Sequence, residues 1–325
     1  MNEIEKSWCT SILSQNGHSL QRQELLKAEA SHRKFYRVHT ENSSFIFMVS
    51  PPSFENNEQF VNLSEIFNQN HIPVPRVLEF APEEGHVLMT DVGSKHLEEL
   101  YNTDAEPLAI NNALDTLIKI QNITHQEIPD YTAQRLKEEL SIFDEWILDK
   151  FLESPHLKGS ETEASRLLVT QALEQKQVCI HRDYHCRNLL FSYESLGVVD
   201  FQDALIGPAF YDLASLLFDC YHDFHDDRIK RYLIYYLDNS TIHKQLQFST
   251  ALRWLTLTAI QRRIKAIGIF ARLFLRDNKI THLRYIPSVL SKTIDLMSRY
   301  PEMKPLEKLF VSIKQPVIRK IEPLL

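Results

Sequence analysis

The chain has 325 residues, of which 43 % are apolar and 24 % are charged, and its formal net charge is -7. This length exceeds that of one typical domain, and the acidic balance excludes general nucleic-acid binding, which needs a basic surface. No apolar run is long and uncharged enough to span a bilayer, and the first residues lack the basic start and apolar core of a signal peptide. We therefore expect a globular cytoplasmic protein whose four cysteines are reduced thiols.

The first part of the chain predicts a small, mostly β lobe. Residues 33–49 read as two strands joined by a polar turn. Apolar side chains then recur at helical spacing in residues 55–69, and prolines end that helix. Two further short strands are expected at 76–80 and 86–90. Together these elements predict a sheet with one helix over residues 1–91.

The remaining residues, 92–325, predict a larger and mostly helical lobe. Helical patterns are expected at 105–122, 134–153, 160–175 and 208–221, and long helices dominate from there to the end of the chain. A strand-rich segment at 178–200 interrupts them. The fold class predicted from this pattern is α+β, with two unequal lobes joined by a short hinge after residue 91.

The strand-rich segment carries an unusual concentration of reactive side chains. The sequence VCIHRDYHCRNLLFS predicts a strand, a polar loop and a second strand, and catalytic groups usually lie on loops held by a rigid scaffold. Asp183 and Asn188 lie five residues apart on this loop, and Asp200 ends the next strand. Oxygen ligands of this kind suit Mg²⁺. The spacing is typical of phosphoryl transfer, with Asp183 as the catalytic base and Asn188 and Asp200 as metal ligands.

The other polar residues of this region permit two interpretations each. The loop as a whole could serve only for structural hydrogen bonds. His181 is expected to be a structural hydrogen-bonding residue, and His185 and Arg187 either face the acceptor or are solvated. Asp212 opens a helix, where it either favours the helix N-terminus or braces the loop from beneath, and we favour the second interpretation.

These stretches, HRDYHCRNLLF and GVVDFQDALIGPAFYDL, are similar to those of the aminoglycoside phosphotransferase and choline kinase-like enzymes. That superfamily has the protein-kinase-like two-lobed fold, and the resemblance covers nearly the whole chain. ASHRKFYRV, FMVSPPSFENNEQF and QRRIKAIGIFARL narrow the resemblance to bacterial kinases that act on the anomeric hydroxyl of N-acetylmuramate and N-acetylglucosamine in cell-wall sugar recycling.

The resemblance implies ATP as the phosphate donor and Mg²⁺ as the metal. It places a phosphate-covering loop at residues 31–36, and an adenine edge along residues 88–91. Many relatives have a strand lysine that falls at Met48 here, so either Arg33, Lys34 or Arg37 replaces it or the phosphates are held more weakly. The nucleotide-binding residues expected on this basis are Ser31, His32, Arg33, Lys34, Met48, Met89 and Thr90.

The acceptor is expected to bind beside Asp183 in the second lobe. A carbohydrate could stack on an aromatic ring, bind carboxylates through its hydroxyl groups and lie near a basic helix. The acidic and basic residues could equally be solvated faces of their helices. The candidate acceptor-binding residues are His185, Arg187, Asp203, Glu139, Trp146, Gln261 and Arg262.

Three functions remain open at this point. The first is an ATP-dependent kinase acting on an amino sugar at its anomeric hydroxyl, and the second is an aminoglycoside or choline-like kinase. The third is a pseudokinase or nucleotide-binding scaffold, which Met48 in place of lysine would favour and the intact Asp183, Asn188 and Asp200 set opposes. No nucleic acid, membrane or obligate protein partner is expected.

Overall fold

The computed structural model describes residues 1–26, 32–192 and 195–325. The chain forms two compact units. The first contains residues 1–125 and 187–204, and the second contains residues 126–186 and 205–325. The first compact unit therefore extends beyond residues 1–91. The two lobes expected at 1–91 and 92–325 stay a prediction.

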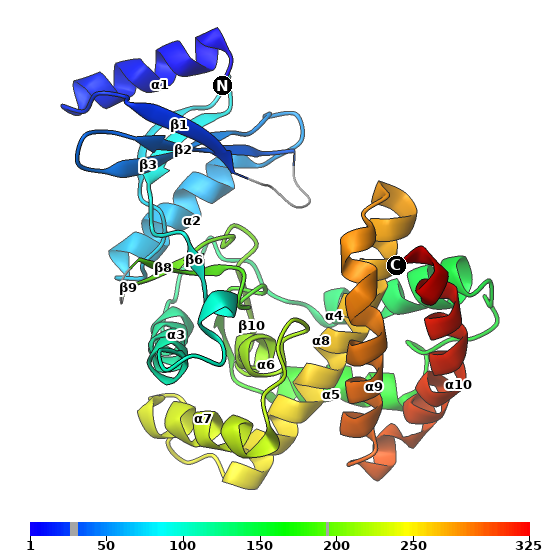
Figure 1. The fold of residues 1–325 in the computed structure, drawn as a ribbon. Helices are drawn as coiled ribbons and strands as arrows, with labels where there is room; N and C mark the ends of the chain where they lie inside the picture. The colour runs from blue at the N-terminus through cyan, green and yellow to red at the C-terminus, as the bar shows by residue number, and fades with distance from the viewer. Residues whose placement is uncertain (27–31, 193–194) are drawn as a thin grey trace. The chain divides into compact units, whose positions relative to one another are not determined.

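A five-stranded antiparallel sheet forms the core of the first unit, in the order β1-β2-β3-β5-β4 (Figure 1). Its central strand, with the sequence SFIFMV, is buried on both faces, and Phe47 and Met48 are fully buried. The strands predicted from apolar alternation are present. The five strands are β1 (Arg22–Leu26), β2 (Lys34–His39), β3 (Ser44–Val49), β4 (Val77–Ala81) and β5 (His86–Thr90).

Two helices pack on this sheet, α1 (Glu3–Gln15) and α2 (Asn57–Gln69). Helix α1 begins with a capping box at Asn2 and buries Cys9 and Leu13 in a cluster with residues of β2, β3 and β5. The expectation of a single helix in this part is wrong, because α1 was not recognised from its weakly amphipathic sequence. Strand β1 was also missed.

The first unit also holds the segment that follows the catalytic loop. Strands β6 (Lys95–His96), β8 (Leu189–Ser192) and β9 (Ser195–Val198) form a three-stranded sheet, beside the 3₁₀ helix η1 (Leu97–Leu100) and helix α3 (Glu106–Gln121). Gly197 is required in β9, because an added Cβ atom would lie 2.5 Å from Cβ of Val92.

The second unit is mostly helical, with one two-stranded antiparallel sheet of β7 (Gln177–Ile180) and β10 (Leu205–Pro208). Strand β10 was not predicted, and helix α6 is shorter than the expected helix from 208 to 221. The helices are α4 (Ala133–Phe143), the π-helix η2 (Asp144–Phe151), α5 (Glu163–Glu174), α6 (Tyr211–Leu217), α7 (Asp226–Asn239), α8 (Phe248–Asp277), η3 (Ile280–Tyr285), α9 (Ile286–Met297), η4 (Pro301–Met303), α10 (Lys304–Ile321) and η5 (Glu322–Leu324).

The 30-residue helix α8 runs through the second unit and packs against α4, α6 and α9 (Figure 1). Gly268 allows its close approach to α4, because an added Cβ atom would lie 2.8 Å from the backbone of Ile142 and Phe143. This packing turns one face of α8 toward the residues that precede Asp183. In the described part of the chain, no helix is long and apolar enough to cross a membrane.

Candidate active site

The loop that carries Asp183 starts at the end of β7, and its first residues are held by a buried carboxylate. Asp212, in the first turn of α6, is fully buried. Its Oδ2 accepts a hydrogen bond of 2.6 Å from the His181 backbone N–H, and its Oδ1 accepts one of 2.9 Å from that of Arg182. Asp212 therefore fixes the direction in which the chain leaves the strand.

Arg182 has a left-handed backbone with φ of +77°, a conformation that costs a non-glycine residue about 1–3 kcal/mol. Contacts from other helices hold it there. Arg262 of α8 donates to the Arg182 carbonyl oxygen at 2.8 Å, and the Arg182 guanidinium donates to Glu139 of α4 at 3.1 Å. Strain of this kind persists only where the surroundings enforce it, so the position of the next residue, Asp183, is tightly determined.

The Asp183 side chain is partly exposed, as a group that meets a substrate must be. Burial raises its pKa, but four neighbouring basic side chains bring the pKa down to about 2. In decreasing order of influence, these side chains are Lys265, His185, Arg262 and Arg182. Asp183 is therefore a carboxylate at neutral pH, which can accept a hydrogen bond from a hydroxyl group.

Glu139 is the centre of a buried ionic cluster in the same unit. Its Oε1 accepts hydrogen bonds from Lys265 at 2.9 Å and from Arg182 at 3.1 Å, and its Oε2 accepts from the hydroxyls of Tyr131 and Tyr211. Burial raises the pKa of Glu139, but Lys265, the Tyr131 hydrogen bond and Arg182 lower it to about 2. Glu139 is thus a charged anchor for two cations.

The far end of the loop is held in a similar way. The buried Asp219 accepts a hydrogen bond of 3.1 Å from the Cys186 backbone N–H.

Two histidines lie along the same loop. The His181 ring is buried, and its Nδ1 accepts a hydrogen bond of 3.3 Å from the Asp183 backbone N–H. His185 packs edge-on against Tyr221, with 5.6 Å between ring centroids.

In the first unit, the hairpin of β8 and β9 brings together Asn188 and Asp200. Leu189 pairs with Val198, and the Val199 backbone N–H donates to the Asn188 carbonyl oxygen at 3.0 Å. The Asn188 amide lies 3.4 Å from Asp200 Oδ2. Asp200 is exposed and has φ of +66°, a left-handed backbone that aspartate tolerates better than most residues.

These oxygen-bearing groups fit a hard cation. Within the described residues, no group of three or more histidine, cysteine, aspartate or glutamate side chains is arranged to hold a metal ion. A carboxylate and an amide do not make such a group, and Mg²⁺ is commonly held by one or two protein ligands together with phosphate oxygens and water. The exposed Asp200 carboxylate, with Asn188 beside it, meets that requirement.

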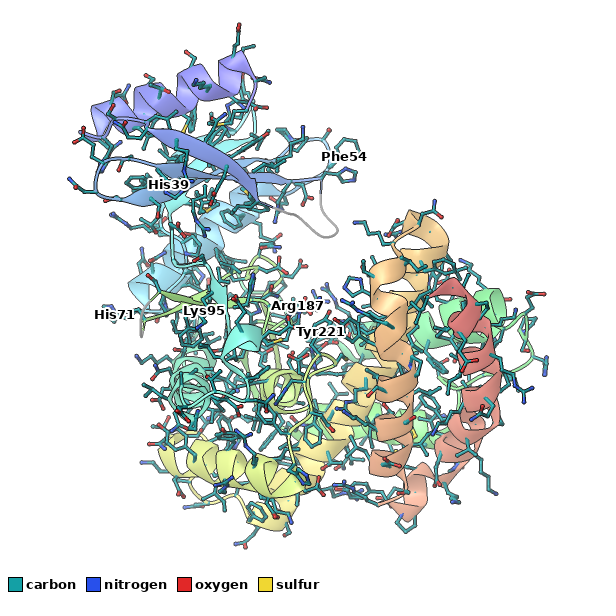
Figure 2. The ribbon with its side chains drawn as sticks, in the orientation of Figure 1. His39, Phe54, His71, Lys95, Arg187 and Tyr221 are labelled. Atoms are coloured by element: carbon teal, nitrogen blue, oxygen red, sulfur yellow. The ribbon has the colours of Figure 1, made fainter. Side chains whose placement is uncertain are left out.

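Two predicted acceptor residues lie in the first unit. Arg187, labelled in Figure 2, forms an ion pair of 3.0 Å with Glu98, and its carbonyl oxygen accepts a hydrogen bond of 2.8 Å from His96. Asp203 is exposed. The Arg187 charge is therefore matched by Glu98 within the first unit.

The five-stranded sheet presents three cations near the position of the missing lysine. Arg33 is buried and forms an ion pair of 3.1 Å with Glu55, before α2, and its Nε lies 3.3 Å from Ser50 Oγ. Arg37 is instead bound to Asp91 at 2.7 Å. Lys34 is exposed at the start of β2.

The other predicted nucleotide residues are distributed over the same unit. Met48 and Met89 are buried in β3 and β5. Thr90 Oγ1 accepts a hydrogen bond of 2.9 Å from the Arg76 backbone N–H. The exposed His32 ring stacks on Phe54 with 4.4 Å between centroids. Ser31 lies outside the described residues.

Two further predicted acceptor residues have no described contact with the Asp183 loop. Trp146, in η2, has Lys150 Nζ 3.6 Å from its ring centroid, and none of its described contacts leads to Asp183. Gln261 is buried in α8, and its Nε2 has no hydrogen-bond partner among the residues that the structure describes. Arg262 and Glu139 are the two acceptor candidates that contact this loop.

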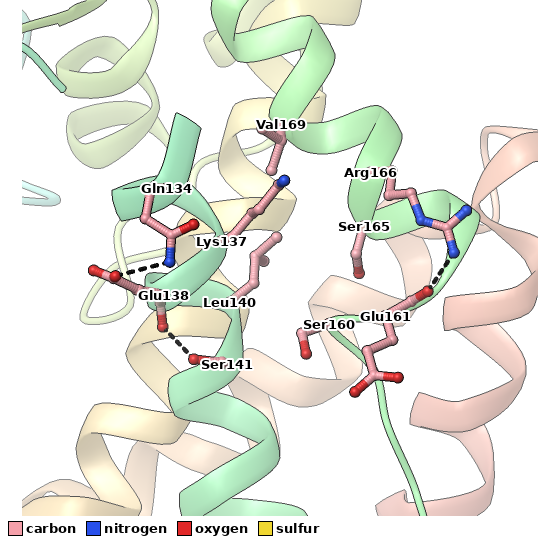
Figure 3. A pocket seen from close by; sticks show the side chains of 10 residues that line it. All are labelled: Gln134, Lys137, Glu138, Leu140, Ser141, Ser160, Glu161, Ser165, Arg166 and Val169. Carbon is pink, nitrogen blue, oxygen red and sulfur yellow. Dashed lines mark hydrogen bonds between the residues drawn. The ribbon is translucent and has the colours of Figure 1, made fainter. Parts of the chain in front are cut away.

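A hollow of about 490 Å³ lies between α4 and α5 and contains none of the predicted site residues (Figure 3). Glu138, Ser141, Ser160 and Arg166 are among the side chains that line it. Glu138 and Glu139 are adjacent in the sequence, yet Glu138 faces this hollow and Glu139 faces the ionic cluster. The hollow is therefore separate from the candidate active site.

Sequence reasoning missed several residues of the site. Arg182 and Asp219 were not selected, nor were the two tyrosines that hydrogen-bond Glu139, and Lys265 was considered only as one cation of the basic helix and not as a site residue. A signal for Lys265 exists, because it follows Arg262 by three residues and so lies on the same face of α8. The contacts of Arg182, Lys265 and Tyr211 with Glu139 join distant parts of the chain, so no local sequence pattern predicts them.

Nearly the whole chain is similar to known phosphotransferases. The model of the phosphotransferase enzyme family matches residues 22–248. An N-acetylmuramate/N-acetylglucosamine kinase of Pseudomonas aeruginosa is 34 % identical over 303 residues, covering 90 % of this chain and 89 % of the relative. A protein of the same name from Pseudomonas putida is 31 % identical over 294 residues, covering 88 % and 87 %.

The fold is also found in solved structures. A Plasmodium vivax ethanolamine kinase has a TM-score of 0.64 at 12 % identity, with 88 % of this chain and 84 % of that chain covered. This likeness shows the fold alone, and it confirms the predicted kinase-like class. The family model matches most of the chain, and the two relatives are similar over nearly its whole length. The chain therefore belongs to the phosphotransferase enzyme family.

Proposed function

We propose that this protein is an ATP-dependent kinase that phosphorylates the anomeric hydroxyl of N-acetylmuramate and N-acetylglucosamine. The observation that carries the proposal is the identity of 31–34 % with kinases named for these two sugars, extending over 88–90 % of the chain. The ionised Asp183 carboxylate, on a loop held by α4, α6 and α8, supports it. A cytoplasmic location goes with this proposal, because the reaction consumes ATP.

Asp183 would act mainly by orientation. A carboxylate with a pKa of about 2 is a weak base, so it accepts a hydrogen bond from the acceptor hydroxyl and takes the proton late in the reaction. That timing suits phosphoryl transfer, in which most catalysis comes from positioning and charge stabilisation. The proton leaves the hydroxyl as its oxygen forms the bond to phosphorus and the bond to ADP breaks.

The metal would be held by Asn188 and Asp200. When bound there, Mg²⁺ neutralises charge on the phosphates of the nucleotide. The Asp200 carboxylate supplies the negative charge for this site, and Gln202, which donates to Asp200 Oδ1 at 2.7 Å, holds that carboxylate in place. In this proposal Asp212 and His181 support the loop and do not touch the substrate.

We infer that Arg33 replaces the lysine that is absent at Met48. Arg33 is buried and lies beside Ser50, two residues after Met48, and its ion pair with Glu55 holds the guanidinium there, whereas Arg37 is held by Asp91 and by the Gly93 carbonyl oxygen. The remaining nucleotide candidates, His32, Lys34, Met89 and Thr90, would line the same site.

Replacing Arg33 by methionine is therefore expected to raise the KM for ATP by about 10- to 100-fold, the usual range for losing a hydrogen bond to a charged group. Lys34→Met, measured in parallel, should change the KM for ATP much less. A larger rise in Lys34→Met than in Arg33→Met would assign the phosphate contact to Lys34. Thermal unfolding of both variants checks that the sheet is intact.

The acceptor proposal is tested with a blocked sugar. N-acetylglucosamine should be phosphorylated, and its methyl glycoside should not be, because the oxygen that Asp183 must reach within roughly 2.6–3.2 Å no longer carries a proton. Phosphate transfer from labelled ATP measures both. A methyl glycoside that reacts as fast as the free sugar contradicts the anomeric assignment.

The same assay tests the alternatives. Turnover of kanamycin or choline, with none on either amino sugar, would make the protein an aminoglycoside or choline-like kinase. Binding of Mg-ATP without turnover on any of these acceptors would make it a pseudokinase.

A further inference from the structure

Lys265 has a donor that its contacts leave unused. An ammonium group has three N–H donors. One donates to Glu139 Oε1 at 2.9 Å and another to the Tyr211 hydroxyl at 3.2 Å. For the third, no acceptor is found among the described residues. The side chain is 11 % exposed, so it is not fully enclosed by the protein.

Glu139 does not depend on Lys265 for its hydrogen bonds. Its Oε1 also accepts from Arg182 at 3.1 Å, and its Oε2 accepts from Tyr131 and Tyr211. Both oxygens therefore keep a donor, and the Glu139 charge keeps a partner in Arg182, if Lys265 turns toward a ligand. A lysine used only to neutralise Glu139 would duplicate Arg182.

Arg262 lies one turn from Lys265 on the same face of α8, since residues three apart on a helix are neighbours. It donates to the Arg182 carbonyl oxygen at 2.8 Å and to Ser215 Oγ at 2.6 Å, and the Tyr211 ring lies 4.3 Å from its Cζ. A guanidinium has five N–H donors, and the described residues accept from two of its nitrogens. Arg262 is thus rigidly held, with donors still available.

Both cations face the loop of Asp183. Arg262 contacts the residue before Asp183 directly, and Lys265 does so through Glu139 and Arg182. The pKa of Asp183 gives independent support, because Lys265 is the cation that lowers it most against the effect of burial. Burial lowers the pKa of Lys265, but Tyr211, Glu139 and Asp183 raise it above its ordinary value, so Lys265 is charged.

We propose that Lys265 and Arg262 form an oxyanion-binding site beside Asp183, on the side of the acceptor. The ligand is a carboxylate of the acceptor or the phosphoryl group that the acceptor receives; both present oxygens that bind to a lysine and an arginine in the same way. This inference rests on the proposed function, because N-acetylmuramate carries such a carboxylate and N-acetylglucosamine does not.

The test compares both sugars in Lys265→Met. Losing a hydrogen bond to a charged group should lower kcat/KM by about 10- to 100-fold. A loss confined to N-acetylmuramate and seen in KM identifies the acceptor carboxylate as the ligand, and an equal loss of kcat on both sugars identifies the phosphoryl group. Activity within twofold of the wild type on both sugars overturns the proposal.

Two further variants separate binding from folding. Lys265→Arg keeps the charge and should restore most of the activity that Lys265→Met loses. Lys308→Met, at an exposed position of α10 in the same unit, is the matched control and should behave as the wild type. If Lys265→Met unfolds, Lys265→Gln gives the same comparison with a polar side chain of similar length.

If the wild type phosphorylates neither sugar, the proposed function fails and the oxyanion site is tested by itself. Inorganic phosphate should then raise the Tm of the wild type and of Lys265→Arg, and raise that of Lys265→Gln much less. Equal shifts in wild type and Lys265→Gln would exclude the site.

Discussion

Asp183→Asn is expected to lower kcat by about 10²–10⁴, the range for losing a general base. Asparagine has nearly the shape of aspartate, but its amide cannot accept the proton of the acceptor hydroxyl and carries no charge. The variant also removes the carboxylate that Lys265 and Arg262 face, so the acceptor hydroxyl is no longer held for transfer. Turnover at saturating ATP and N-acetylglucosamine measures the effect.

The control is Glu138→Gln, at an exposed position of α4 beside the hollow of Figure 3. It makes the same change from carboxylate to amide outside the ionic cluster and should keep full activity. Nucleotide binding by Asp183→Asn, followed as a shift of Tm with Mg-ATP, should remain. Retention of more than about a tenth of the wild-type turnover by Asp183→Asn is incompatible with its role as base, for which a loss of at least 10² is usual.

Asp200→Ala is expected to abolish the stabilisation of the protein by Mg-ATP. A ligand at 100 times its Kd stabilises the folded state by about 2.7 kcal/mol, and this contribution disappears when binding is lost. The physical reason is that Asp200 is the one carboxylate of the proposed metal site, and an amide alone does not compensate a divalent charge. The Tm shift between apo protein and protein with Mg-ATP measures the change.

Asp200→Asn separates the metal from the backbone. Asp200 has a left-handed φ of +66°, which asparagine tolerates and alanine does not. Alanine should therefore also lower the Tm of the apo protein, whereas asparagine should leave it nearly unchanged and still weaken the Mg-ATP shift. If Asp200→Ala keeps the full Mg-ATP shift, the metal is bound elsewhere.

The parts of the fold that were predicted correctly have strong local patterns. Strands β2, β3 and β5 follow from apolar alternation and polar turns, and α2 follows from helical spacing that ends before a proline. Strand β1 was missed because RQELL has little apolar alternation and lies at the edge of the sheet, where little of it is buried. Helix α1 buries only Glu5, Cys9, Ile12 and Leu13, with Trp8 partly buried against the same cluster, and these residues leave a weak pattern.

The sequence by itself determined the loop with Asp183 and the hairpin that places Asn188 beside Asp200, because these depend on spacing within about twenty residues. Only the tertiary structure decided which distant charges surround Asp183. Glu139 and Lys265 are 126 residues apart, yet they form an ion pair of 2.9 Å. Charges are buried only where a partner is present, and the packing of α8 against α4 and α6 supplies those partners, which no local pattern along the chain encodes.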